Sequence, residues 1–423
     1  MAIAERLAID GGTPVRATPL LPGWPGGLLI GAEEKAAVLE VIESRSLFRH
    51  YGPRSLHRAV ALERAFAEAM GAKHALAVTS GTGALITSLA AAGIGPGDEV
   101  AVPTYTWIAT VSAVVILGAV PLFVDIDESL NMDPAALEAT LTPHTRAVIP
   151  VHMRGAGADL QPMLEVARKR GLAVIEDAAQ AVGGSYRGRR LGTLGQFGAY
   201  SLQYHKTITT GEGGIVVTDD ARLYERAVRF HDQGSVRMEE LDETSAGSSP
   251  LIIGINFRMA ELTAAVGLAQ LKKMDGIIGE MRRHQRRIKS EIRGISGITP
   301  RKLSDPDGET AATLIFFAPT PEQAERFARA LIAENIHASV PWWSGQHVYN
   351  HFDQIIERRL LSTQKCSWEC PRYQGSATLR KGQFPRTDSI LKRAVHLDIH
   401  PLFTDRDVDD IIAGIRKVAR VVL

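Results

Sequence analysis

The chain has 423 residues, of which 45% are apolar, and this is enough for two domains with substantial cores. Its 48 Lys and Arg residues nearly balance its 47 Asp and Glu residues, for a formal net charge of +1. Because nucleic-acid and membrane-surface proteins normally carry a basic excess or patch, this balance argues against both kinds of partner.

The amino-terminal stretch MAIAERLAIDGG carries acidic residues and lacks a continuous apolar core, so it does not resemble a signal peptide. The most apolar run, VSAVVILGAVPLFV, is interrupted by Gly118 and Pro121 and is too short for a membrane helix. The two cysteines, Cys366 and Cys370, have no second pair or histidine cluster beside them, so we expect neither a metal site nor a disulfide framework. These features predict a soluble, cytoplasmic protein.

From about residue 74 to 219, short apolar runs alternate with helix-like segments such as 83–94, 107–118 and 158–171. Several runs are rich in β-branched residues and apolar on both faces, which predicts an α/β domain with a mainly parallel sheet. A short turn-rich link joins the last two runs, so these two could pair antiparallel. The runs are HALAVTS (74–80), EVAVPT (99–104), VPLFVDI (120–126), RAVIPVH (146–152), LAVIEDA (172–178), GAYSLQ (198–203) and GGIVVTD (213–219).

Beyond residue 218 the pattern changes. A helix over 219–234 precedes a polar stretch from Ser235 to Pro250, for which we expect a loop, and then one long helix over 259–294 that bends near Gly276. Strand and helix patterns follow at 313–320, 321–335, 394–401 and 404–422. We therefore predict an amino-terminal arm (1–30), a large α/β domain (31–275) and a small α+β domain (276–423).

Ligands of parallel sheets bind at the carboxyl ends of the strands, and several residues that could take part in binding or catalysis lie there. Ser80-Gly81-Thr82-Gly83 opens a helix after the first run, as a phosphate-binding helix terminus or as an ordinary helix cap. Trp107 follows the second run. It could be a core residue, or its ring could be a surface on which an aromatic ligand stacks.

Two further positions complete the set. Glu176 and Asp177 end an apolar run, where a carboxylate is costly unless paired; one could cap the next helix, or Asp177 could hold a protonated heterocyclic nitrogen. Lys206, in SLQYHKTITTGEGG, is either a surface residue or a Schiff-base lysine. A phosphate cradle, a stacking aromatic, an acid and a lysine, each at its own strand end, are the four groups that pyridoxal phosphate needs.

The chain resembles the sugar aminotransferases of the DegT/DnrJ/EryC1/StrS family from about residue 27 to its carboxyl terminus. The resemblance implies the aspartate-aminotransferase-like fold type I, with a mixed, mostly parallel seven-stranded sheet and a smaller α+β domain. It also implies a homodimer with shared active sites, pyridoxal 5'-phosphate as cofactor with its pyridoxamine form as intermediate, and glutamate or glutamine as amino donor. The strings that carry it are TSGTGAL, GDEVAVPTYTWIAT, VIEDAAQAVGGSYRGRRLGTLGQFGAYSLQ, HKTITTGEGG and GINFRMAELTAAVGLAQL.

The resemblance assigns roles by position. Lys206 matches the Schiff-base lysine, Asp177 the partner of the ring nitrogen, and Trp107 the stacking aromatic. The other matches are Gln180 near the phenolic oxygen, Gly81, Thr82 and Ser201 at the phosphate, and Asn256 at the same phosphate but from the other subunit of a dimer.

Some members of the family carry histidine in place of the lysine and act as dehydratases. Here His205 is adjacent, but Lys206 has the spacing from Ser201 and from GEGG that the lysine should have. We therefore expect an aminotransferase and expect no chemical role for His205. A dehydratase or lyase on the same fold and a non-catalytic regulator are the alternatives.

The acceptor is left open among a nucleotide sugar, a keto-cyclitol and a sugar acid, in amino-sugar, lipopolysaccharide or aminoglycoside biosynthesis. LAIDGGTPVRATPLLPGWP resembles relatives that aminate scyllo-inosose, whereas SRSLFRHYGP and VHMRGAGADLQPM resemble a subgroup that aminates an 8-oxo octulosonate. Arg154 could bind a substrate carboxylate or make a surface salt bridge. Trp342 and His347 could line a sugar pocket or belong to the core of the small domain. The stretch from Cys366 to Tyr373 matches no pattern.

Overall fold

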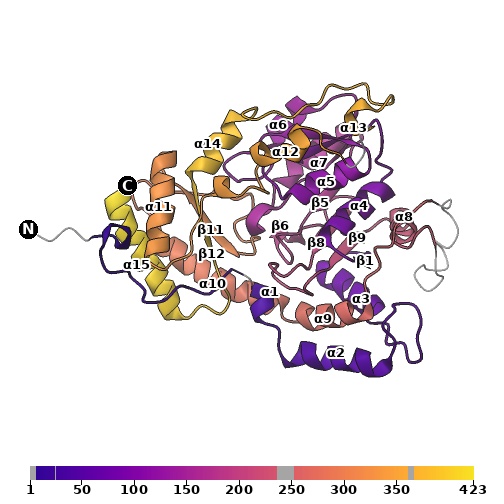
Figure 1. The fold of residues 1–423 in the computed structure, drawn as a ribbon, viewed down its shortest axis with the longest axis horizontal. Coiled ribbons are helices and arrows are strands. Elements are labelled where there is room, and N and C mark those ends of the chain that lie inside the picture. Colours follow the sequence, from indigo (N-terminus) through magenta and orange to yellow (C-terminus); the bar gives the residue numbers. More distant parts are fainter. Residues whose placement is uncertain (1–5, 24, 236–251, 361–365) are drawn as a thin grey trace, which may run out of the picture.

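The computed structural model describes residues 6–23, 25–235, 252–360 and 366–423. Its largest element is a seven-stranded sheet in the order β1-β9-β8-β5-β4-β2-β3 (Figure 1). All neighbouring strands are parallel except β9, which runs antiparallel to both β1 and β8. The seven predicted strands and the predicted antiparallel pair are therefore confirmed. The strands are β1 (His74–Val78), β2 (Glu99–Pro103), β3 (Val120–Val124), β4 (Thr145–Val148), β5 (Ala173–Asp177), β8 (Phe197–Ser201) and β9 (Gly214–Thr218).

Helices cover both faces of this sheet, which explains why its strands are apolar on both sides. In β2, Val100 and Val102 face the helix layer on one side of the sheet, which we call the first cover, and Ala101 faces the layer on the other side, the second cover. The first cover consists of α4 (Gly81–Ala91), α5 (Ile108–Ile116) and α8 (Ala221–His231). The second consists of α6 (Pro134–Thr140) and α7 (Leu160–Arg170) at one end, and of α3 (Arg58–Met70) and α9 (Glu261–Leu271) at the other.

The long helix predicted over 259–294 is two helices, so that prediction is wrong in its detail. α9 ends at Leu271 and α10 spans Met274–Ile292, so the break lies at residues 272–273 and not near Gly276. The two halves have different partners: α9 packs on α3 and on α2 (Ala32–Ser44), whereas α10 packs on α15 (Asp405–Val422). The chain breaks where it passes from one helix layer to the next.

A three-stranded antiparallel sheet with its own helices lies at the left of Figure 1. β11 (Thr313–Phe317) is its central strand, between β10 (Thr299–Pro300) and β12 (Ala394–Asp398). α11 (Pro321–Ala333), α14 (Pro385–Arg393) and α15 pack with it. This arrangement agrees with the predicted small α+β domain, and its boundaries at residues 30 and 275 stay predictions.

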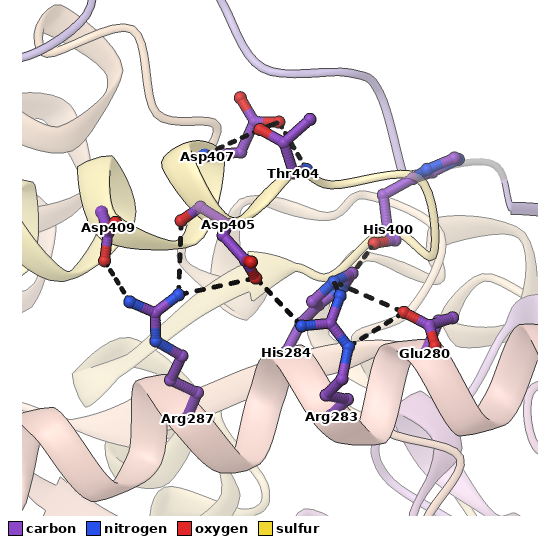
Figure 2. A network of polar contacts seen from close by, with 9 residues as sticks. All are labelled: Glu280, Arg283, His284, Arg287, His400, Thr404, Asp405, Asp407 and Asp409. Carbon is purple, nitrogen blue, oxygen red and sulfur yellow. Dashed lines mark hydrogen bonds and ion pairs between the residues drawn. The ribbon is translucent and has the colours of Figure 1, made fainter.

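Figure 2 shows how the start of α15 is fixed to α10. Thr404 and Asp407 cap the helix reciprocally, with Asp407 N donating to Thr404 Oγ1 (3.2 Å) and Thr404 N to Asp407 Oδ2 (2.8 Å). Arg283 on α10 donates to Asp405 (3.0 Å), and the buried His284 contacts the carbonyl oxygen of His400 (3.1 Å). These contacts hold the segment that directly follows β12.

The amino-terminal arm binds the small domain. The Glu334 carboxylate accepts hydrogen bonds from the backbone N–H groups of Ala8 (2.9 Å) and Val15 (2.8 Å). It also forms a buried ion pair with Lys417 on α15 (2.9 Å). The arm then runs along the molecule toward Gly23 and the short helix α1 (Pro25–Leu28).

Part of the carboxyl-terminal region returns to the large sheet. Tyr349 N donates to the carbonyl oxygen of Thr104 (2.9 Å), and the Tyr373 hydroxyl donates to Glu99 (2.7 Å). The stretch that matched no pattern, which includes α13 (Cys366–Glu369), thus contacts the sheet at the amino-terminal end of β2. A further short helix there is α12 (Asp353–Ile356).

Two remaining predictions concern the loop after α8 and the absence of a membrane helix. The loop predicted from Ser235 to Pro250 lies outside the described residues beyond its first position. Within the described ranges, no helix combines the length and the apolar character needed to cross a membrane.

Candidate active site

The carboxyl ends of the parallel strands and the small domain enclose a cavity of about 710 Å³, which we call the cleft. Most of the predicted site residues line it, although they come from separate parts of the sequence. Two predicted residues, Asn256 and Trp342, do not. The predicted residues that line the cleft are Gly81, Thr82, Trp107, Arg154, Asp177, Gln180, Ser201, Lys206 and His347.

The start of α4 forms one end of the cleft. Ser80 caps the helix by accepting a hydrogen bond from Gly83 N (2.9 Å). The N–H groups of Gly81 and Thr82 bond no other described residue, so they are free to bind an anion. A β-carbon at Gly81 would lie 2.7 Å from Cβ of Ser201, so only glycine allows this close approach. These features fit a phosphate group.

The two acids that end β5 have separate roles. Glu176 is fully buried away from the cleft, where its carboxylate accepts three backbone N–H groups of residues 192–195 and contacts His152 Nε2 (3.0 Å). Asp177 lines the cleft and accepts hydrogen bonds from Thr110 Oγ1 (2.7 Å) and Ala179 N (3.1 Å). Burial raises the pKa of Asp177, while these two bonds and the charge of a nearby lysine oppose that shift. A cationic ring nitrogen beside it would favour its charged form.

Lys206 enters the cleft from the turn that follows β8. Its ammonium group makes no hydrogen bond or ion pair with any residue in the described part of the chain. Burial lowers the pKa of Lys206, although the negative charge of Asp177 acts in the opposite direction. A lysine with a lowered pKa is more often in the unprotonated, nucleophilic form.

Trp107 and His347 form another wall of the cleft. Trp107 is 45% exposed, and its ring centre lies 4.9 Å from that of His347 at an angle of 59°. The backbone of residues 346–347 accepts hydrogen bonds from Thr106 N (3.0 Å) and Ile108 N (2.8 Å), which holds His347 over the end of β2. Burial, with the positive charges of Arg154 and other groups, lowers the pKa of His347 to about 2, so this imidazole is neutral.

Hydrogen bonds fix the backbone and the Nε of Arg154, and its side chain lines the cleft. Its backbone is left-handed (φ 55°, ψ 38°), and its N–H donates to Gln180 Oε1 (3.1 Å). Its Nε donates to the hydroxyl oxygen of Tyr105 (3.2 Å), whereas its two terminal nitrogens bond no described residue. Burial disfavours its charge, but Tyr105 and the negative charge of Asp398 outweigh burial and raise the pKa of Arg154. The surface salt bridge considered from the sequence is not formed with any described residue.

Two predicted residues lie elsewhere in this chain. Asn256 is exposed, and its side-chain oxygen accepts a hydrogen bond from Arg258 N (3.2 Å). Trp342 packs under Lys392, whose Nζ lies 4.4 Å from the ring centre, and against the hydrophobic core, so it does not line the cleft. In this chain the aromatic face of Trp342 is occupied by its neighbours.

Six cleft residues from the small domain were not predicted, among them His337, Ser339, His396 and Asp398. We call these four the small-domain wall. A signal existed in the run AVHLDIHP, because His396 and Asp398 are two residues apart and therefore lie on the same face of β12. Thr110 was also missed; it lies one helical turn from Thr106, and their hydroxyl oxygens are 2.7 Å apart.

Comparison with known proteins gives a consistent result. The model of the DegT/DnrJ/EryC1/StrS aminotransferase family matches residues 29–370. The chain is 35% identical to the L-glutamine:2-deoxy-scyllo-inosose aminotransferase of Micromonospora echinospora over 97% of each chain. It is 47% identical to the GDP-perosamine synthase of Caulobacter vibrioides over 51% of this chain and 57% of that one. The crystal structure of 3-amino-5-hydroxybenzoic acid synthase has 29% identity and a TM-score of 0.77, covering 96% of this chain and 100% of that chain. The predicted fold class is thus confirmed.

Proposed function

The chain belongs to the DegT/DnrJ/EryC1/StrS aminotransferase family, and we propose that it moves an amino group from glutamate or glutamine to the ketone or aldehyde of a sugar. The family implies pyridoxal phosphate as the cofactor. One observation carries the proposal: Lys206 and Asp177 reach the same cleft from the neighbouring strands β8 and β5, beside the free helix terminus of α4.

The residues of the cleft fit this cofactor. Gly81, Thr82 and Ser201 would hold its phosphate, Trp107 would cover its ring, and Asp177 would face its ring nitrogen. When bound, pyridoxal phosphate supplies an electron sink for the negative charge that develops on the substrate carbon. Gln180 would lie near its phenolic oxygen. Asn256 is exposed and outside its own cleft, and we propose that it completes the phosphate site in a second copy of the chain.

The protein residues have distinct tasks in such a reaction. Lys206 Nζ, with its lowered pKa, would take a proton from the carbon of the amino donor in the first half of the reaction and would give a proton to the acceptor carbon that receives the amino group in the second half. Thr110 Oγ1 and Ala179 N orient the Asp177 carboxylate and favour its charged form. The neutral His347 and the exposed face of Trp107 limit the space beside Lys206.

Arg154 supports a sugar acid as the acceptor. Its two terminal nitrogens bond no described residue, and a guanidinium binds a carboxylate through two parallel hydrogen bonds. The named relatives act on a cyclitol or make a nucleotide-linked sugar, and an acceptor of either kind without a carboxylate is the alternative. We propose that a carboxylate of the acceptor lies against Arg154.

The test is an absorbance measurement on the purified protein with pyridoxal phosphate. We expect the band of the covalent lysine adduct in the wild-type protein, its disappearance on adding glutamate or glutamine, and no such band in K206A. A band that neither donor changes would refute the donor assignment. A band that persists in K206A would refute the role of Lys206.

The same preparation separates the alternatives. An aminotransferase that has consumed its donor regains the band when a keto sugar is added, and the product carries the amino group. A dehydratase would release a deoxygenated sugar without nitrogen. A regulator would bind sugar without a donor-dependent change in absorbance.

A further inference from the structure

The small-domain wall is a rigid surface that faces the strand ends across the cleft. Its two segments are joined as a short antiparallel bridge, in which Ser339 and His396 exchange both backbone hydrogen bonds (2.8 Å each). The segment after β12 is in turn fixed to α10 by the contacts of Figure 2. The backbone of this wall at Ser339 and His396 is therefore held in place before any ligand binds.

A single carboxylate lies at the centre of the wall. Asp398 Oδ1 is 3.2 Å from Nε2 of His396, and Oδ2 is 3.4 Å from Nδ1 of His337. Gly23 of the arm lies directly against Asp398, and a β-carbon at residue 23 would overlap the carboxyl group. The carboxylate thus has His396, His337 and Gly23 as close neighbours, and it lines the cleft.

His396 faces Asp398 with a ring nitrogen that is not aligned for a hydrogen bond. The residue is 4% exposed, and its Nδ1 contacts Ser339 Oγ (3.0 Å). Its Nε2 is 3.2 Å from Asp398 Oδ1, but neither that contact nor any other with a described residue has hydrogen-bond geometry. A buried ring nitrogen in a poorly aligned contact gains from a ligand hydroxyl group that bonds to both it and the carboxylate.

The charges select the kind of ligand. A carboxylate repels a phosphate or a second carboxylate, so the wall is unsuited to an anion. Arg154 is close enough for its charge to affect the pKa values of His396 and Asp398, and it disfavours a cationic ligand. No cluster of side chains in the described ranges is arranged to bind a metal ion. Neutral hydrogen-bond donors remain, and in a sugar these are hydroxyl groups.

We propose that the small-domain wall is a diol-binding site, in which the Asp398 carboxylate accepts hydrogen bonds from two adjacent hydroxyl groups and His396 Nε2 bonds to one of them. Assigning this diol to the acceptor sugar rests on the proposed function. The site would orient the acceptor with its hydroxyl groups toward β12 and its carbonyl group toward Lys206. It would therefore distinguish polyhydroxylated acceptors from simple keto acids.

Three unreactive six-carbon compounds test this proposal by isothermal titration calorimetry on the cofactor-loaded protein. scyllo-Inositol carries hydroxyl groups only, D-gluconate carries hydroxyl groups and a carboxylate, and hexanoate carries a carboxylate only. D398N keeps the shape of the side chain and removes its charge. We expect about tenfold weaker binding of scyllo-inositol and D-gluconate to D398N, the loss typical of a hydrogen bond to a charged group, and a change of less than about twofold for hexanoate.

A second variant, G23A, tests the same carboxylate if D398N does not fold. G23A keeps the carboxylate but displaces it, and we expect the same selective loss for the two polyols. The matched control is D307N, an acid outside the contacts of Figure 2 whose side chain is 92% exposed, for which we expect unchanged binding of all three compounds. Wild-type protein that binds neither polyol more tightly than hexanoate would overturn the proposal, as would equal losses for all three compounds in D398N.

Failure of this inference can be told from failure of the proposed function. The calorimetric affinities require no turnover, whereas the donor-dependent loss of the absorbance band tests amino transfer without any polyol. A protein that responds to glutamate but binds polyols independently of Asp398 would keep its proposed function and lose its diol site.

Discussion

Replacing Arg154 by methionine separates acidic from neutral acceptors. Methionine is unbranched and of similar length, so it fills the space of the arginine stem and removes only the guanidinium. The fold should survive, because Arg154 forms no ion pair with a described residue and loses one side-chain hydrogen bond, to Tyr105. A loss of about 1 kcal/mol predicts a decrease of no more than about 3 °C in Tm for a chain of this size.

The expected kinetic effect follows from the two free terminal nitrogens of Arg154. A hydrogen bond to a charged group contributes about 1.5–3 kcal/mol, and the cleft is open to solvent, so we take the lower value for each of two bonds. The total of about 3 kcal/mol corresponds to a loss of about 10²-fold in kcat/KM for an acceptor that carries a carboxylate. An acceptor without a carboxylate loses none of this binding.

The assay starts from protein loaded with pyridoxamine phosphate, which bypasses the amino donor and its own carboxylates. An 8-oxo octulosonate serves as the acidic acceptor and scyllo-inosose as the neutral one. R154M should react about 10²-fold more slowly with the acid and within about threefold of the wild-type rate with the cyclitol. R154K keeps a point charge without the paired geometry and should fall between the two.

Equal losses on both acceptors would refute this reasoning, because Arg154 would then act on something common to both, such as the position of Gln180. An unchanged rate with the acid would show that no carboxylate contacts Arg154. A wild-type protein that reacts only with the neutral acceptor would overturn the sugar-acid proposal directly.

Three further predictions concern other parts of the molecule. T110V removes a hydrogen bond that favours the charged form of Asp177, so the pKa of Asp177 should rise further; the acid limb of the donor reaction then moves to higher pH, whereas T110S should not shift it. G81A places a β-carbon 2.7 Å from Cβ of Ser201, so equilibrium dialysis should show cofactor binding weakened by about tenfold or more, and unchanged affinity would contradict a phosphate site there. E334A leaves a lysine of α15 buried and unpaired and frees the arm, so urea unfolding should show a loss of about 3–5 kcal/mol; a loss under about 1 kcal/mol would mean that the arm is not held by this carboxylate.

Much of the fold could be read from the sequence because its signals are local. Each strand of the large sheet is a short apolar run. The cleft residues predicted from this sheet end their strand or follow it within a few positions, as Asp177 and Lys206 do. Since parallel strands share one carboxyl edge, local spacing was enough to predict that these side chains would meet.

The errors and omissions depend on contacts between distant segments. The helical periodicity of the sequence continues through residues 272–273, although the helix breaks there. The two halves pack on different helices, α9 on α2 and α3 and α10 on α15, and these distant contacts leave no mark in the local pattern. The aromatic residues Trp342 and Trp107 look alike in sequence, yet one is covered by Lys392 and the core while the other faces the cleft.

The sequence alone thus determined the large sheet and the residues that face its carboxyl edge, because both depend on spacing within short segments. Only the tertiary structure decided that Arg154 lacks a described ion-pair partner and that Asp398, far away in the chain, lies in the same cleft. The physical reason is that the pairing of a charge depends on every segment that folds against it, and no local pattern carries that information.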